Sequence, residues 1–270
     1  IAERGAFTVA FGGGEPLLHP EIARIAEHAR ALGLVPVVTT SGIGLSAERA
    51  RTLHAFAQIN VSHDGLPDTR WPEGARVAER AIEMLVAEGI PVGVNVVLTR
   101  SLLAETGQPL LDLVERVLAL GAREVQLLRY KPAGRGASLE YLERRLTPLQ
   151  VEQLPALLTT LVARTSIRID CALVPLLSFE RVDDLLTLAV MGCEAGRGLS
   201  AIDVHGNDAP CSFLPGATSA VAEWPARAPE PCASCPVRAV CRSGCRVVAQ
   251  HLGGDPFAPD PECPRVRALT

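Results

Sequence analysis

Cysteines dominate the chemistry that the C-terminal part of this sequence can perform. Seven of the eight cysteines fall between Cys193 and Cys263. Four of them follow the spacing C-x2-C-x5-C-x3-C, and these are Cys232, Cys235, Cys241 and Cys245. Thiolates are soft, electron-donating ligands, and a four-coordinate iron or zinc needs four donors that converge on one point. The spacing therefore predicts a metal-binding module that holds two centres.

A glycine-rich turn is the second feature with chemical meaning. Gly12, Gly13, Gly14, Glu15 and Pro16 come directly after the apolar run Thr8–Phe11. Glycines let the backbone approach a ligand closely and adopt positive φ. Ligands of α/β barrels bind at the carboxyl ends of the strands, where this turn would lie. Taken alone, the turn is explained by a structural role about as often as by a binding site.

The elements that must position these residues alternate along the first part of the chain. Amphipathic helical patterns separate short apolar runs, which we expect to be strands. Such strands indicate a parallel sheet covered by helices, and βα units of roughly 30 residues favour a full or partial barrel over a Rossmann sheet. The expected strands are Thr8–Phe11, Val35–Thr39, Ile59–Ser62, Val92–Leu98 and Val125–Leu128.

The character of the sequence changes near residue 165. A helix is expected to begin at Thr147, because Pro148 suits the first helical position and Gln150 completes a capping box. After a short strand at Ile167–Asp170, glycine, proline and cysteine become frequent and long periodic helices stop. We therefore predict an α/β domain over residues 1–165 and a small loop-rich domain over residues 166–270.

Composition excludes several classes of function. The 270 residues carry a formal net charge of −4 and no basic run, which argues against nucleic acid as a partner. No apolar stretch is long enough to cross a bilayer, and the N-terminal residues do not read as a signal peptide. A dense cysteine cluster outside the secretory pathway indicates metal binding rather than disulfides, so we expect a cytoplasmic protein.

Together, the two features resemble a known family. Gly13-Gly14-Glu15-Pro16 matches the GGEP motif of radical S-adenosylmethionine (SAM) enzymes, and the seven cysteines match the SPASM domain that follows the barrel in part of that superfamily. The resemblance implies a partial barrel of the radical SAM type followed by an iron–sulfur SPASM domain. It also implies that the GGEP backbone binds the methionine amino group of SAM, and that Ser62 and Asp64 lie near SAM or substrate.

The resemblance further implies two auxiliary [4Fe–4S] clusters. Cys232, Cys235, Cys241 and Cys263 would bind the outer cluster, and Cys193, Cys211 and Cys245 would bind the inner one. Two clusters with full cysteine ligation need eight thiolates, and the eighth is either Cys171 or absent. In the second case Cys171 is a core residue and the inner cluster has an open iron site. Structural zinc is the rival for the whole module, but the nearby histidines lack the spacing of a zinc finger.

The family binds a third, SAM-cleaving cluster through a CxxxCxxC loop before the GGEP motif, whereas the first cysteine here is Cys171. We expect that loop upstream of Ile1 in the full-length protein, so that residues 1–270 alone are inactive. The alternative is a non-catalytic homologue that binds a peptide or another partner. The intact enzyme would modify a peptide or protein through a 5′-deoxyadenosyl radical, with electrons from a flavodoxin or ferredoxin. Ser212 replaces the Asp of the sulfatase-maturing branch, which argues against formylglycine formation.

Basic residues near the two features leave alternatives open. Arg238, Arg242 and Arg246 alternate with the cysteines and either offset cluster charge or form a solvated basic face. Arg129, Lys131 and Arg135 follow the Val125–Leu128 strand and either meet an acidic group of SAM or substrate or are solvated.

Overall fold

The computed structural model describes residues 1–65, 73–137, 139–178, 181–216, 221 and 223–269, with only the backbone of Arg135. The chain divides into two compact units. Unit 1 comprises residues 1–97, 102–127 and 165–168, and unit 2 comprises residues 98–101, 128–164 and 169–270. The domain limits 1–165 and 166–270 stay a prediction.

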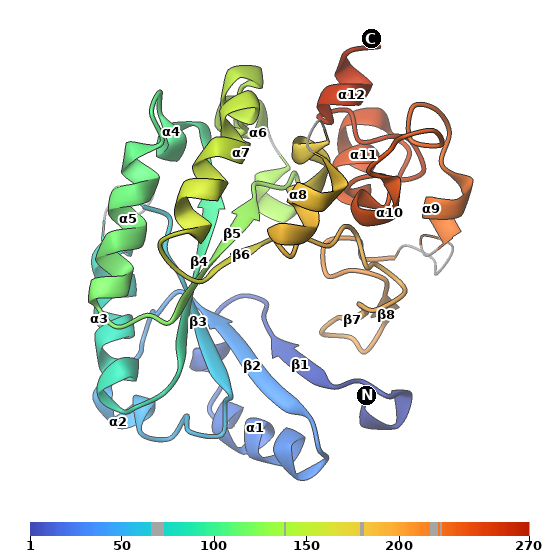
Figure 1. The fold of residues 1–270 in the computed structure, drawn as a ribbon. Helices are drawn as coiled ribbons and strands as arrows, with labels where there is room; N and C mark the ends of the chain where they lie inside the picture. The colour runs from blue at the N-terminus through green and yellow to red at the C-terminus, as the bar shows by residue number, and fades with distance from the viewer. Residues whose placement is uncertain (66–72, 138, 179–180, 217–220, 222, 270) are drawn as a thin grey trace. The chain divides into compact units, whose positions relative to one another are not determined.

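The main sheet has six strands, which lie in the order of the sequence. The registers of the first four strands are parallel, with Phe11 opposite Val38, Thr40 opposite Val61 and Ser62 opposite Asn95. All six strands are parallel and form a partial (β/α) barrel, which confirms the predicted fold class. The strands are β1 (Thr8–Phe11), β2 (Val35–Thr40), β3 (Gln58–Ser62), β4 (Val92–Leu98), β5 (Glu124–Arg129) and β6 (Ile167–Ile169) (Figure 1).

Helices cover one face of the strands of unit 1. Successive residues of β2 and β3 alternate between half-buried and buried, because one face of the sheet meets helices and the other faces the barrel interior. The core includes Val38, Ile59, Val61 and Val94, which are fully buried. The short η1 (Ala2–Arg4) precedes β1, and the elements between the strands are η2 (Pro16–Leu18), α1 (Ile22–Ala31), α2 (Ala47–Ala50), α3 (Gly74–Ala87), α4 (Arg100–Leu103) and α5 (Gln108–Ala119).

From residue 170 on, unit 2 forms short helices and turns, as its frequent glycine and proline predict. Its longest helix, α7 (Pro148–Val162), begins with the predicted capping box of Thr147 and Gln150 and continues through Pro155. The other elements are η3 (Gly134–Gly136), α6 (Glu140–Arg144), η4 (Val174–Leu177), α8 (Val182–Thr187), β7 (Ala201–Ile202), β8 (Asp208–Ala209), α9 (Trp224–Arg227), α10 (Arg238–Cys241), α11 (Arg246–Gly253) and α12 (Pro264–Arg267). Among the described residues, every helix is too short or too polar to span a bilayer.

Candidate functional site

The glycine turn of unit 1 leaves its backbone open. It connects β1 to η2, and Gly12, Gly13 and Gly14 are all exposed. Gly13 has a φ of 119°, a left-handed conformation that favours glycine, and a Cβ there would meet no atom within 4 Å. The conformation rather than crowding therefore explains glycine at this position, and the free amides and carbonyls are available to a ligand.

The Glu15 side chain holds this turn in place. Its carboxylate accepts hydrogen bonds from Thr40 Oγ1 at 2.6 Å, from the backbone and hydroxyl of Ser41 at 2.7 and 2.5 Å, and from the Leu17 amide at 3.1 Å. The bond to Leu17 caps the N-terminus of η2. Because the carboxylate joins the end of β1 to the end of β2, a ligand at this turn would meet the Glu15 backbone rather than its charge.

Ser62 and Asp64 lie at the same edge of the sheet as the glycine turn, because the carboxyl ends of parallel strands coincide. Ser62 is the half-buried last residue of β3, and Asp64 is exposed in the turn that follows. Between them, His63 is buried, and its Nδ1 accepts the Gly65 amide at 3.1 Å. Burial lowers the pKa of His63, and the Glu79 carboxylate 3.7 Å from Nε2 partly opposes that shift.

Four cysteines of unit 2 line one cavity. They are the four predicted ligands of the outer cluster, Cys232, Cys235, Cys241 and Cys263, and Ser243, Gly244 and Asp260 share the lining. Burial raises the pKa of Cys232 to about 11 and that of Cys241 to about 12, and the nearby Cys263 thiol adds to both shifts. The Cys232 and Cys241 thiols therefore need a metal centre to be deprotonated at neutral pH, as ligation requires.

The remaining four cysteines of unit 2 form a second set. Cys171 lies close enough to Cys193 and Cys245 for their charges to interact, and Cys211 interacts in the same way with Cys193 and with Cys245. Burial raises the pKa of all four thiols. Cys211 and Cys245 also pack against the same apolar group, which includes Leu214 and Val248. Cys171 therefore lies near two of the three predicted inner ligands, Cys193 and Cys245.

The polar groups of the first cavity suit an iron–sulfur cluster. Ser243 is buried there, and its hydroxyl has no hydrogen-bond partner. The Gly244 amide donates to the thiol of Cys241. Free O–H and N–H donors that face a negatively charged group are typical of cluster-binding loops. Among the described residues, no three His, Cys, Asp or Glu side chains are placed to hold a single metal ion.

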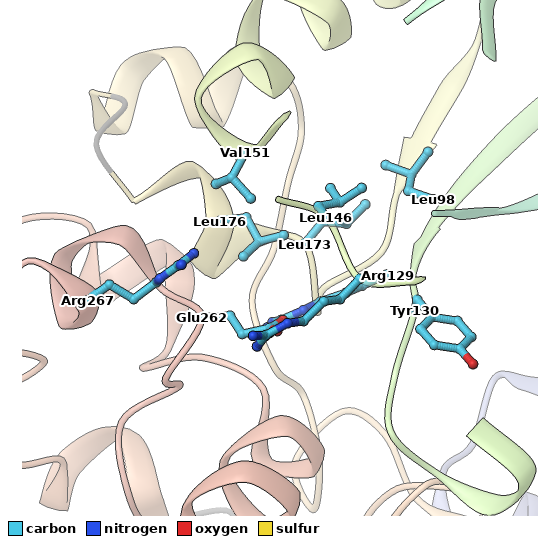
Figure 2. Close-up of a pocket in the computed structure, with 10 residues that line it drawn as sticks. Leu98, Arg129, Tyr130, Leu146, Val151, Leu173, Leu176, Glu262 and Arg267 are labelled. Atoms are coloured by element: carbon cyan, nitrogen blue, oxygen red, sulfur yellow. The ribbon is translucent and has the colours of Figure 1, made fainter. Parts of the chain in front are cut away.

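A buried ion-pair network stands beside the cysteines. The Arg129 guanidinium at the end of β5 donates to Asp260 at 2.7 and 3.1 Å and to Glu262 at 2.8 Å. Asp260 also accepts the amides of Cys245 and Glu262, both at 3.0 Å. Figure 2 shows Arg129 and Glu262 extending toward each other at a pocket whose other walls are largely leucine and valine. The network fixes the backbone at Cys245 and the segment that leads to Cys263.

Most of the flanking basic residues are already engaged. Arg129 is 4% exposed, so the expectation of a solvated side chain is wrong for it, and its charge is matched by carboxylates of the chain itself. Lys131 pairs with Asp170 at 2.7 Å. Arg242 pairs with Glu194, whereas Arg246 is 1% exposed and is not part of a solvated face. The side chain of Arg135 lies outside the described residues.

Sequence reasoning missed Ser243, Asp260 and Glu262. Asp260 and Glu262 flank Pro261 just before the last cysteine, and an acidic pair in such an apolar, cysteine-rich neighbourhood is a signal for buried ion pairs. The signal for Ser243 is weaker, since a serine between two cysteines is ordinarily a turn residue.

The sequence is similar to known proteins over nearly its whole length. Residues 1–117 match the profile of the Radical SAM superfamily. The PqqA peptide cyclase of Streptomyces rochei is 31% identical over 97% of this chain and 77% of its own length. An AdoMet-dependent heme synthase of Methanosarcina barkeri is 24% identical, over 97% of this chain and 84% of the relative.

Among solved structures, Streptococcus suis SuiB bound to S-adenosylmethionine superposes with a TM-score of 0.70 at 14% identity. The match covers 95% of this chain and 66% of SuiB, so the chain spans just under two thirds of that protein. The chain belongs to the radical SAM superfamily, in the group whose barrel is followed by a SPASM domain.

Proposed function

We propose that this chain is the substrate- and cluster-binding part of an enzyme that modifies a peptide or protein by hydrogen abstraction. The Streptomyces rochei relative is named a peptide cyclase, and it aligns over nearly the whole chain. In this superfamily, SAM reduced at a [4Fe–4S] cluster supplies a 5′-deoxyadenosyl radical. The cavity lined by Cys232, Cys235, Cys241 and Cys263 is the observation that carries the proposal.

The residues of unit 1 would orient SAM. The exposed backbone at Gly13 and Gly14 offers donors and acceptors for the amino and carboxylate groups of the methionine moiety. Glu15 keeps that backbone rigid through its bonds to Thr40 and Ser41. Pro16 fixes the start of η2 behind the turn. Ser62 and Asp64, at the same edge, would contact SAM or the substrate.

The residues of unit 2 would hold two auxiliary clusters. Cys232, Cys235, Cys241 and Cys263 would bind one of them, and Cys193, Cys211 and Cys245 the other. We assign Cys171 as the fourth ligand of the second cluster, supported by its electrostatic interaction with Cys193 and Cys245. With four thiolates the inner cluster is closed, which suits an electron carrier better than a substrate-binding site.

Two substitutions test the ligand assignment. Cys171→Ala should remove or alter the electron paramagnetic resonance signal of the inner cluster, and Cys232→Ala should remove that of the outer cluster. Each should leave the other signal in place. An unchanged inner-cluster signal in Cys171→Ala would exclude Cys171 as a ligand and restore the open iron site, which could accept a thiolate of a cysteine-containing peptide.

The reaction needs a supply of single electrons, which we assign to an external flavodoxin or ferredoxin. All eight cysteines are free thiols, which suits the reducing cytoplasm where such carriers occur. Because no cysteine precedes Cys171, we expect residues 1–270 alone to leave SAM uncleaved. A non-catalytic binding protein is the alternative that this expectation keeps open.

The test is reductive SAM cleavage by the full-length protein under dithionite, measured as 5′-deoxyadenosine. Gly13→Ala should lower the rate about tenfold or more, because alanine at this left-handed φ costs about 1–2 kcal/mol. Gly12→Ala is the matched control, since Gly12 lies outside the left-handed region and its Cβ would meet open space. No cleavage by the full-length protein would favour the non-catalytic alternative.

The substrate class has its own test. A low-molecular-weight extract of the source cells should accelerate 5′-deoxyadenosine formation, and protease treatment of that extract should abolish the effect. Acceleration that survives protease would contradict a peptide substrate and favour a small molecule, as the name of the Methanosarcina barkeri heme synthase indicates for that relative.

A further inference from the structure

Arg246 is a buried cation held mainly by neutral groups. It opens α11 directly after Cys245, and its side chain is 1% exposed. Its guanidinium lies over the Trp224 ring, 4.2 Å from the ring centre. It donates to the carbonyls of Pro256 at 2.7 Å, of Ala258 at 3.0 Å and of Ser243. Burial of a cation costs free energy unless an anion compensates it, yet none of the ion pairs among the described residues includes Arg246.

Thiols of both cysteine sets lie close enough to interact electrostatically with this cation. The charge of Arg246 acts on Cys193 and Cys245 of the inner set and on Cys232 of the outer set. Its backbone amide also donates a hydrogen bond to the Cys193 thiol. The carboxylate whose charge acts on Arg246, that of Asp260, is already bound in bidentate fashion by Arg129. The anions that would balance Arg246 are therefore the ligated thiolates.

The loop between Cys241 and Cys245 adds a second, more local feature. Arg242, Ser243 and Gly244 have φ values of 57°, 67° and 93°, so three consecutive residues are left-handed. Two of them are not glycine, and side chains other than glycine are strained in this conformation. Such strain persists only where the surroundings enforce it, and it is concentrated at functional sites. The loop places the unpartnered Ser243 hydroxyl at the cavity of the outer cysteines.

We propose that Arg246 raises the reduction potential of both auxiliary clusters, and that the Ser243 hydroxyl raises that of the outer cluster alone. The inference rests on the proposed function, since it presupposes the clusters. A cysteine-ligated cluster is negatively charged and gains one further negative charge on reduction. A fixed cation therefore stabilises the reduced form, as does a hydrogen bond donated to a cluster or cysteine sulfur. Arg246 and Ser243 are positioning and tuning residues rather than ligands.

The experiment compares four variants of the 270-residue chain, which contains both cysteine sets and no other cysteine. After anaerobic reconstitution, iron and sulfide are counted, and midpoint potentials are then measured by redox titration monitored by electron paramagnetic resonance. Arg246→Met removes the charge at similar side-chain length, Arg246→Lys keeps it, and Ser243→Ala removes only the hydroxyl. Arg227→Met is the control, because Arg227 is exposed and pairs with Glu223.

Arg246→Met should lower both midpoint potentials by at least 59 mV, which is a tenfold change in the one-electron reduction equilibrium. Arg246→Lys should lower them less, Ser243→Ala should lower only the outer potential, and Arg227→Met should change neither. Unchanged potentials in Arg246→Met with full iron content would overturn the inference while leaving the proposed clusters intact. A wild-type chain that binds no iron and sulfide would instead refute the proposed function.

If Arg246→Met fails to load iron, Arg246→Lys and Ser243→Ala test the inference instead. A loaded Arg246→Lys with nearly normal potentials, together with a lowered outer potential in Ser243→Ala, would support the inference. Failure of Arg246→Lys to load iron as well would show that Arg246 acts on folding, and would overturn its tuning role. An unchanged outer potential in Ser243→Ala would overturn the role of the hydroxyl.

Discussion

The two compact units of this chain are stabilised in different ways. Unit 1 has a parallel sheet whose apolar face is covered by helices, and residues such as Ile59, Val61 and Val94 are fully buried. Apart from α7, unit 2 has short helices and a hairpin whose strands have two residues each. It buries Arg129, Asp260 and Arg246 beside its cysteines. A hydrophobic core can stabilise a unit without help, whereas buried charges and small elements need additional compensation. We therefore expect unit 1 to keep its fold without metal and the cysteine-bearing part of unit 2 to depend on the proposed clusters.

Metal removal should show the largest difference between the units. Ligated clusters contribute their binding free energy to folding, because the sites do not exist in the unfolded chain. In the cluster-free chain we expect amide hydrogen-exchange protection to be largely lost over residues 193–263 and retained in β1 to β4. Equal protection of both units in the cluster-free chain would contradict this account of unit 2.

The buried ion pairs of unit 2 should have the next largest effect. Arg129→Met leaves Asp260 and Glu262 buried with less compensation, which costs about 3–5 kcal/mol when one partner of a buried pair is removed. Urea unfolding of the loaded chain under anaerobic conditions measures the loss. Arg227→Met, which removes an exposed pair with Glu223, should change the unfolding free energy by less than about 1 kcal/mol. Similar losses in the two variants would show that the Arg129 network contributes no more to the unfolding free energy than an exposed ion pair does.

In unit 1, Glu15→Gln should have a smaller effect. The amide keeps the shape but has only one acceptor oxygen, so it cannot satisfy both hydroxyls and both amides that the Glu15 carboxylate serves. We expect a loss of about 1–3 kcal/mol, confined to unit 1. Glu21→Gln is the control, since Glu21 is an exposed partner of Arg24. An unchanged thermal midpoint of unit 1 in Glu15→Gln would argue against the Glu15 link.

The smallest expected effect concerns pH. Burial lowers the pKa of His63 in the folded chain from its usual value of 6.5, so the unfolded chain binds more protons just below that pH. The stability of unit 1 is therefore complete above about pH 6.5 and decreases as the pH falls. His63→Gln should flatten this dependence in urea unfolding between about pH 7 and pH 5. A slope that is the same in the variant would assign the pH dependence to other groups.

The sequence predicted the sheet well because its strands are local patterns. The predicted limits of the strands differ from the observed ones by at most one residue, as for Val35–Thr40 and Glu124–Arg129. Helix faces were predicted less well. Ile25 and Leu32 share the apolar pattern of α1, but they are 37% and 53% exposed, because the short helix buries only the narrow face of Ile22, Ala26 and Ala29.

The candidate sites, too, were predicted only where their residues form a local pattern in the sequence. The cysteines and the glycine turn were found because each motif is contiguous or regularly spaced. Arg129 and Asp260 are 131 residues apart, so no local pattern relates them. The sequence left open whether Arg246 offsets cluster charge or is solvated, since its burial depends on Trp224 and on carbonyls of the following loop. Contacts of this kind depend on tertiary packing and are absent from any window of the sequence.

Whether this chain holds two auxiliary clusters is tested directly by its iron and acid-labile sulfide content. Both are measured on the anaerobically reconstituted 270-residue chain, together with Mössbauer spectroscopy. Two auxiliary clusters require about eight iron and eight sulfide per chain, in the spectral form of [4Fe–4S] centres. Cys232→Ala should retain about half of each. Bound zinc without labile sulfide, or a full complement of iron in Cys232→Ala, would contradict the account.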